Sequence, residues 1–143
     1  MNRWLFPTEK REFTGKRHLL IGLRTLHLMG ISGYAGFLLF GLESQQWLAL
    51  ALLALVSGLL MFLLEVWSDA IFLLQARGLA VLLKLAIFGW IVFDPTWRVE
   101  GFFCIIALAG YFSHAPAKMR YYLPFSGVNA SSSQKLRELR ELK

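Results

Sequence analysis

Long apolar segments separated by short polar ones occupy most of the chain between residues 19 and 123. A helix needs about 20 residues to cross the hydrocarbon core of a bilayer, which is roughly 30 Å thick. The pattern therefore predicts four membrane-spanning helices, the last of which must continue to about Leu123 to be long enough. Their expected ranges are residues 19–42, 47–65, 78–93 and 101–123.

The segments outside these helices differ in character. Residues 66–77 carry Asp69 and Gln75 beside an apolar stretch, which suits either a short interfacial helix or a longer second helix. Serines and a glycine in residues 126–134 indicate a flexible linker. The tail after it is basic and has Leu136, Leu139 and Leu142 at helical spacing. It would either contact lipid or a partner, or remain solvated. The expected organisation is an N-terminal segment 1–18, a helical domain 19–123, and a linker with a basic tail 124–143.

Composition agrees with a membrane location. Hydrophobic residues make up 57% of the chain and charged residues 17%, whereas soluble domains carry about 25% charged residues. Lys and Arg cluster before the first predicted helix and after the fourth, and such clusters stay on the cytoplasmic side. We therefore expect an all-α integral membrane four-helix bundle in the bacterial inner (cytoplasmic) membrane, with both termini cytoplasmic. The net charge of +6 is explained by this orientation rather than by nucleic-acid binding.

Several chemistries are disfavoured by the residues present. Cys104 is the single cysteine, so an intramolecular disulfide, a cysteine metal cage and covalent c-type haem attachment are excluded. We find no nucleophile–base pair and no phosphate-binding loop, so a conventional enzyme is not expected. The outer halves of the predicted helices are nearly free of polar residues, which argues against a transporter or channel. The N-terminal segment lacks the pattern of a cleaved signal peptide.

Ionisable residues inside the predicted helices need a reason, because burying charge in hydrocarbon is costly. Arg24 and Lys84 can extend to the headgroups, and Glu65 lies at a helix end. His27 and His114 cannot reach as far. At 1.5 Å per residue, counting inward from opposite ends places each histidine about 10 Å from the inner membrane boundary.

Each histidine has a glycine one turn away on the same helix face, namely Gly30 and Gly110. Two imidazoles facing each other across a cleared gap would suit one b-type haem, with His27 and His114 as axial iron ligands. Close helix packing is the alternative role of such glycines. Further candidate haem contacts are Tyr34, Phe37, Tyr111 and Phe112 against the macrocycle, and Arg24, Lys118 and Arg120 for its propionates.

The architecture, with His27 in Arg-Thr-Leu-His-Leu-Met-Gly and His114 in Tyr-Phe-Ser-His-Ala-Pro, resembles small four-helix membrane b-type cytochromes. The resemblance covers the helical region only. Many such cytochromes hold two haems through four histidines. The third histidine here, His18, lies at the membrane edge, so one haem is implied. A fainter similarity links the chain to CopD-like membrane proteins, whose copper role would need outer-face ligands that this chain lacks.

These observations predict a membrane electron-transfer protein holding one bis-histidine haem b near the cytoplasmic leaflet, as a subunit or partner of a larger redox complex. Its partners would be the lipid bilayer, other membrane redox subunits or a quinone, and a homo-oligomer is also compatible. The alternative is a cofactor-free accessory subunit of a membrane complex. In either case an electron carrier or accessory role is favoured over a stand-alone enzyme.

Overall fold

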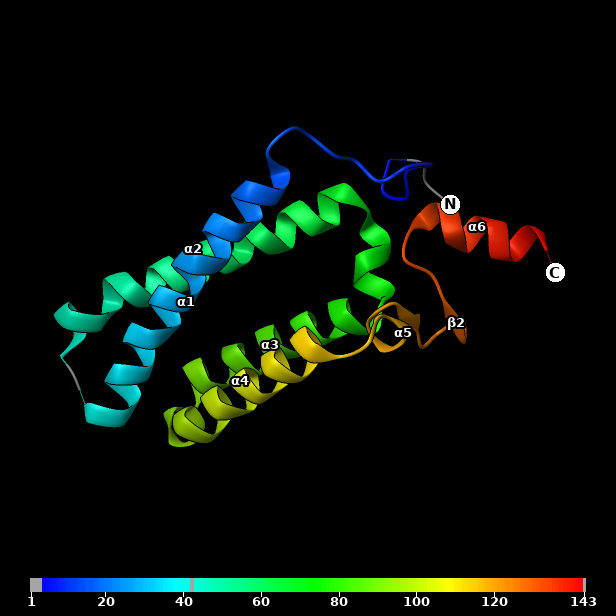
Figure 1. Ribbon diagram of the computed structural model, residues 1–143. Helices are drawn as coiled ribbons and strands as arrows, with labels where there is room; N and C mark the ends of the chain where they lie inside the picture. The colour runs from blue at the N-terminus through cyan, green and yellow to red at the C-terminus, as the bar shows by residue number, and fades with distance from the viewer. Residues whose placement is uncertain (1–3, 42, 143) are drawn as a thin grey trace. The chain divides into compact units, whose positions relative to one another are not determined.

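The computed structural model describes residues 4–41 and 43–142, and the chain is mostly helical (Figure 1). It divides into two compact units, residues 12–65 and residues 1–11 with 66–143. The elements in chain order are α1 Lys16–Phe40, α2 Ser44–Ser68, the 3₁₀ helix η1 Ala70–Leu74, α3 Ala76–Phe93, the 3₁₀ helix η2 Pro95–Trp97, α4 Arg98–His114, α5 Ala117–Arg120, β1 Tyr122–Leu123, β2 Val128–Asn129 and α6 Ser133–Glu141.

Two of the described helices, α2 and α3, are long and apolar enough to cross a membrane. Only 6% of the most apolar stretch of α2 and 17% of that of α3 is buried within the protein, unlike the core helix of a soluble domain. α1 interrupts its apolar sequence with Arg24 and His27, and α4 has 17 residues. The chain is thus mostly helical, as predicted, although it also contains the short strands β1 and β2. Membrane association has support from α2 and α3.

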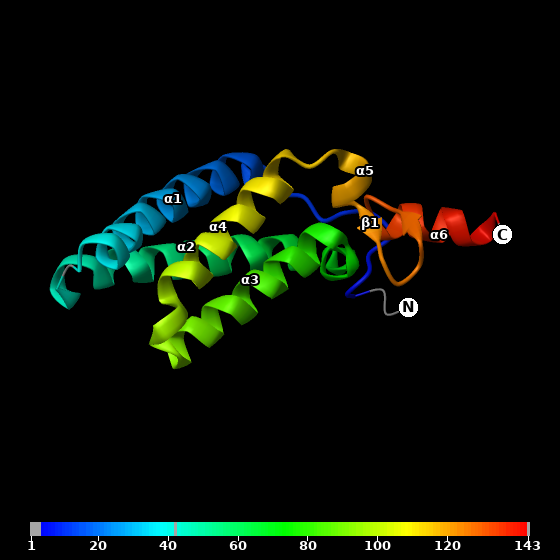
Figure 2. The same cartoon turned by 90° about the horizontal axis from the view of Figure 1, so that it is seen from below.

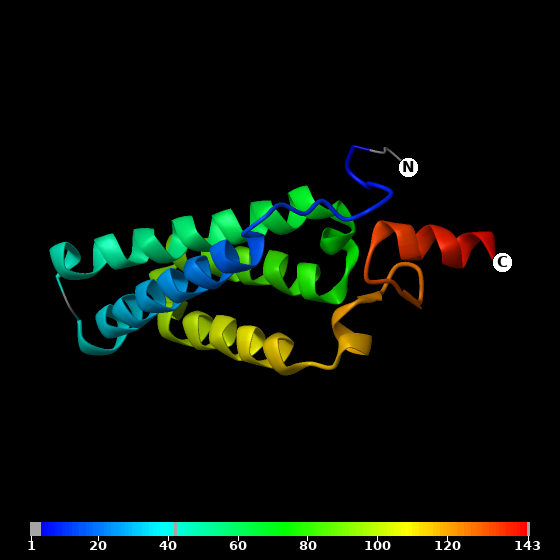
Figure 3. The same cartoon turned by 45° about the horizontal axis from the view of Figure 1, so that its top comes forward.

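In the first unit, α1 and α2 form a helical hairpin with close backbone contact (Figure 3). A Cβ atom on Gly30 would lie 2.5 Å from both the Ala54 nitrogen and the Leu50 oxygen, and one on Gly33 would collide with Leu50. Near the turn, Phe37 stacks on Trp47 with ring centres 4.1 Å apart. Small residues thus let the two helix backbones approach, as is common between membrane helices.

In the second unit, α3 and α4 pack as another hairpin (Figure 1). The turn forms where predicted, since α3 ends at Phe93 and Pro95 begins η2. The Asp94 carboxylate accepts a hydrogen bond from the Thr96 backbone nitrogen and stabilises this turn. Gly101 lies directly against Ile91, which is 1% exposed.

The fourth helix is shorter than predicted. It begins at Arg98 and ends at His114, whereas the apolar pattern indicated residues 101–123. The cause is Pro116: the residue before a proline avoids the helical conformation, and Ala115 has φ −59° and ψ 140°. The chain resumes as the single turn α5 and then as the strand β1.

The C-terminal residues fold into a terminal subdomain, which we define as residues 4–11, η1 and residues 117–142. Its small core contains Ile71, Leu123, Ala130 and Leu136. β1 and β2 pair in antiparallel fashion, Tyr122 opposite Asn129, and Figure 2 shows this hairpin beside α6. The segment predicted as a linker, residues 126–134, has regular structure here: β2 pairs with β1, and Ala130 and Ser133 are buried.

Two polar side chains at the ends of η1 bind this C-terminal segment. The Asp69 carboxylate accepts hydrogen bonds from the Ser133 nitrogen at 2.7 Å, the Ser133 hydroxyl at 2.5 Å and the Ile71 nitrogen at 3.1 Å. The Gln75 side-chain amide donates to the Ala130 carbonyl at 2.8 Å. Asp69, Gln75 and Ser133 are all buried, so these bonds satisfy groups that water does not reach.

The N-terminal segment joins the same subdomain. The Arg11 guanidinium donates to the carbonyls of Trp4 and Trp67 and lies over both indole rings. The Ala70 nitrogen donates to the Leu5 carbonyl at 3.1 Å. Arg137 on α6 donates to the Phe6 carbonyl. Segments from both ends of the chain are thus hydrogen-bonded around the short link between α2 and α3.

Replacing Gly30 with alanine should destabilise the α1–α2 hairpin by about 1–3 kcal/mol, because the new methyl group forces the two backbones apart. The measurement is thermal unfolding in detergent, followed by tryptophan fluorescence. Gly22→Ala is the matched control, since nothing lies within 4 Å of that position. Equal melting temperatures for the two variants would contradict the close packing at Gly30.

Replacing Asp69 with alanine should open the terminal subdomain, because buried donors of Ser133 and Ile71 would lose their acceptor at about 1–3 kcal/mol each. Hydrogen exchange of residues 122–141 should accelerate while exchange in α1 and α2 stays unchanged. Glu138→Ala removes an exposed ion pair with Lys135 and should have little effect. Unchanged protection in the Asp69 variant would show that these bonds do not hold the segment.

Candidate functional site

The His27 imidazole is held between α1 and α2. Its Nδ1 lies 2.7 Å from the Ala54 carbonyl oxygen and 3.4 Å from the Ser57 hydroxyl. A carbonyl oxygen can only accept, so the 2.7 Å contact requires that Nδ1 carries the proton. In the neutral ring Nε2 then keeps its lone pair, and it is the atom that can bind a metal.

The surroundings of the ring are tightly filled by α2. A Cβ atom on Gly58 would lie 2.8 Å from Cε1 of His27, so glycine at this position makes room for the imidazole. Gly30 does not leave the gap beside His27 that the sequence suggested, because the backbone of α2 at Leu50 and Ala54 occupies it. A macrocycle therefore has no space next to Gly30 in this structure.

His114 is in a different environment from the one expected. It is the last residue of α4 and is exposed, and among the described residues its imidazole has no hydrogen-bond partner. Gly110, one turn earlier, has nothing within 4 Å of its position, so space next to His114 is open within its unit. The matched depth of the two histidines rested on a longer fourth helix. In the structure His27 is well inside α1, whereas His114 ends α4.

The candidate aromatic residues contact other side chains. Tyr34 packs edge-on against Trp47, with ring centres 5.7 Å apart, close to the turn between α1 and α2. Tyr111 is exposed, and its hydroxyl lies 3.9 Å from the sulfur of Met119. Tyr111 also packs edge-on against Phe112, with ring centres 5.4 Å apart. The contacts given for these rings are to other aromatic rings and to Met119.

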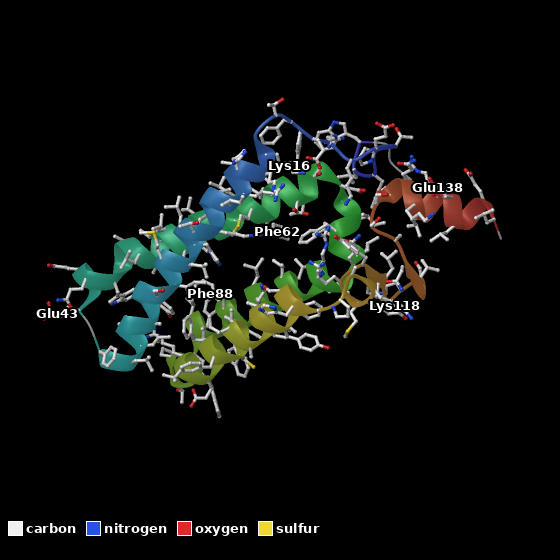
Figure 4. All side chains as sticks on the ribbon, in the orientation of Figure 1. Lys16, Glu43, Phe62, Phe88, Lys118 and Glu138 are labelled. Atoms are coloured by element: carbon white, nitrogen blue, oxygen red, sulfur yellow. The ribbon has the colours of Figure 1, made fainter. Side chains whose placement is uncertain are left out.

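The candidate propionate partners also fall into the two units. Arg24 is exposed on α1, one turn from His27. Lys118 is exposed on α5 and is labelled in Figure 4. The guanidinium carbon of Arg120 lies 5.7 Å from the centre of the Tyr121 ring. Arg24, His27, Gly30 and Tyr34 thus belong to residues 12–65, and Gly110, Tyr111, His114, Lys118 and Arg120 to the other unit.

Sequence reasoning missed the residues that orient His27. Ser57 and Gly58 are a small pair inside the otherwise apolar α2, and Ser57 is 2% exposed. A polar residue beside a glycine in such a run was the available signal, since it marks a place where a neighbouring helix side chain can be accommodated. Arg77 was likewise missed, although its guanidinium lies over the rings of Phe72 and Tyr121.

The chain was compared with family models, with curated proteins and with solved structures. None of these comparisons gives a match. The candidate site therefore has to be judged on its own geometry: one imidazole with a fixed tautomer in α1, and a second, exposed imidazole at the end of α4.

Proposed function

We propose that the chain is an integral protein of the bacterial inner membrane with four spans, α1 to α4, and both termini in the cytoplasm. The apolar length and low burial of α2 and α3 support this topology. The distribution of charge supports the orientation, because Lys and Arg concentrate in the N-terminal segment and after α4. Trp47 and Trp97 would then lie at the outer interface, where indole rings are enriched.

Within this membrane frame, we propose electron transfer through one haem b, which His27 and His114 would hold. The observation that carries the proposal is the 2.7 Å contact from His27 Nδ1 to the Ala54 carbonyl. Histidines that bind metals commonly donate their second ring nitrogen to a carbonyl, which fixes the tautomer and increases the basicity of the ligating nitrogen. Haem would supply one-electron redox chemistry when bound.

The residues of the chain would have limited, defined tasks. Ala54 holds the proton of the His27 imidazole on Nδ1, and Gly58 gives the ring its place against α2. Since α2 fills the space beside Gly30, a haem would have to approach His27 from another side. The open position beside Gly110 fits a flat ligand next to His114 better. Electrons would pass to or from a quinone or a partner redox subunit in the membrane.

A second function, that of a cofactor-free accessory subunit, is favoured by one specific observation. The His27 ring packs on Gly58 and bonds to Ala54, while Gly30 and Gly33 contact α2 directly. These contacts account for His27, Gly30 and Gly33 by helix packing alone. In this case His27 would join α1 to α2, and the protein would contribute its helices to a larger membrane assembly.

An optical spectrum of the detergent-purified protein, expressed with haem supplied, separates the two functions. For a haem carrier we expect a sharp low-spin b-type band after reduction with dithionite, and its loss in His27→Ala. His114→Ala should lose the band or change it to a high-spin form. His18→Ala is the matched control, because His18 is exposed and outside the proposed site.

A flat visible spectrum of the unaltered protein would exclude the electron-transfer function and leave the accessory role. In that case His27→Ala should still lower the melting temperature, because the Ala54–His27 contact between the helices is lost. His114→Ala should leave the melting temperature unchanged, since its exposed ring makes no hydrogen bond within the described chain.

A further inference from the structure

A fixed arginine lies at the first turn of α3. The guanidinium carbon of Arg77 is 5.1 Å from the centre of the Phe72 ring and 4.9 Å from that of Tyr121. Its Nε donates to the side-chain oxygen of Gln75 at 2.8 Å, and Gln75 is fully buried. Aromatic stacking and this hydrogen bond set the orientation of the guanidinium before any ligand arrives.

A second arginine shares the same tyrosine. The guanidinium carbon of Arg120 is 5.7 Å from the centre of the Tyr121 ring. Its Nε is buried and has no hydrogen-bond partner within the described residues. Burying such a donor unpaired is costly. The residue as a whole is only partly buried, so a ligand from outside the chain can reach other parts of this side chain. Lys118, two residues earlier on α5, adds a third positive charge and is exposed (Figure 4).

The three cations lie at one end of the α3–α4 hairpin. Arg77 is in the first turn of α3, and Lys118 and Arg120 follow the end of α4, while the turn at residues 94–97 joins the other ends of these helices. In the topology proposed above, this end meets the cytoplasmic headgroup layer. Tyrosine rings and basic side chains are the residues that contact that layer.

We propose that Arg77 and Arg120, which both lie over the Tyr121 ring, bind the phosphate of an anionic phospholipid headgroup in the cytoplasmic leaflet together with Lys118. The proposal rests on the membrane topology in Proposed function. Guanidinium groups suit phosphate because their planar donors can bind two oxygens at once. In this proposal Lys118 and Arg120 bind a lipid phosphate instead of the haem propionates expected from the sequence. Replacing Lys118 or Arg120 should therefore leave any haem spectrum unchanged.

The test uses the full chain in nanodiscs of phosphatidylcholine with a minor fraction of phosphatidylglycerol. Lipids that remain on the protein are counted by native mass spectrometry. We expect phosphatidylglycerol to be enriched on the unaltered protein, and the enrichment to fall roughly fivefold in Arg120→Gln, the change given by one cation at an anionic surface. Lys135→Gln removes an equal charge from α6, outside the cluster, and should keep the enrichment.

Lys118→Gln is a second variant that should keep the fold, because this side chain is exposed. It should reduce the enrichment while the melting temperature stays unchanged. An enrichment equal to that of the unaltered protein in both Lys118→Gln and Arg120→Gln would overturn the proposal. A fall of similar size in Lys135→Gln would overturn it as well, because the attraction would then be a general effect of positive charge.

A free phosphate could use the same chemistry, so inorganic phosphate is added in a parallel series. Enrichment that persists in phosphate supports a lipid ligand. Phosphate that raises the melting temperature of the lipid-free protein, but not of Arg120→Gln, without any lipid enrichment would overturn the lipid assignment in favour of a soluble phosphate compound. Alkaline carbonate extraction of native membranes is measured separately. An inserted protein without enrichment contradicts this proposal alone, whereas an extracted protein contradicts the topology.

Discussion

The hydrogen bonds of the Asp69 carboxylate hold together segments that are far apart in sequence. One short, buried side chain accepts from its own 3₁₀ helix and from Ser133, 64 residues later. Gln75, at the other end of η1, repeats this arrangement with Ala130. A link of a few residues between α2 and α3 therefore determines where the hairpin and α6 lie, and through them where Arg120 and Tyr121 meet Arg77. The basic cluster depends on this polar core.

The helices were predictable to the extent that apolar length determines them. α1, α2 and α3 end within a few residues of the expected bounds, because Gly41, Asp69 and Pro95 interrupt the helical pattern close to those ends. α4 was not predictable by the same rule. The requirement for a full membrane crossing extended the expected helix beyond Pro116, but the proline ends the helix at His114. The terminal subdomain was missed because its short strands and its buried Ser133 resemble a linker in composition. Their order comes from partners 55 to 64 residues away.

The candidate site was predictable in residue type but not in surroundings. In the structure His27 has a hydrogen-bond partner, and Gly30 has the close-packing role that the sequence left as the alternative. The group that packs against Gly30 depends on the register between α1 and α2. The sequence of α1 alone does not determine that register. In the structure, this group is the backbone of Leu50 and Ala54. For His114 the decisive influence was again Pro116, which places the imidazole at the end of a helix rather than inside one.

The contact between Arg137 and the Phe6 carbonyl joins residues 131 positions apart and has a consequence for synthesis. The N-terminal segment leaves the ribosome first, yet the surface it packs on is complete only after α6 has emerged. During translation, Leu5 and Arg11 can bind residues 67–70 early, whereas Phe6 lacks its Arg137 partner until α6 has emerged. Assembly of this end is a late, long-range step, of the kind that slows folding because a large loop has to close. Fusing a bulky domain directly after α6 would act on that same step.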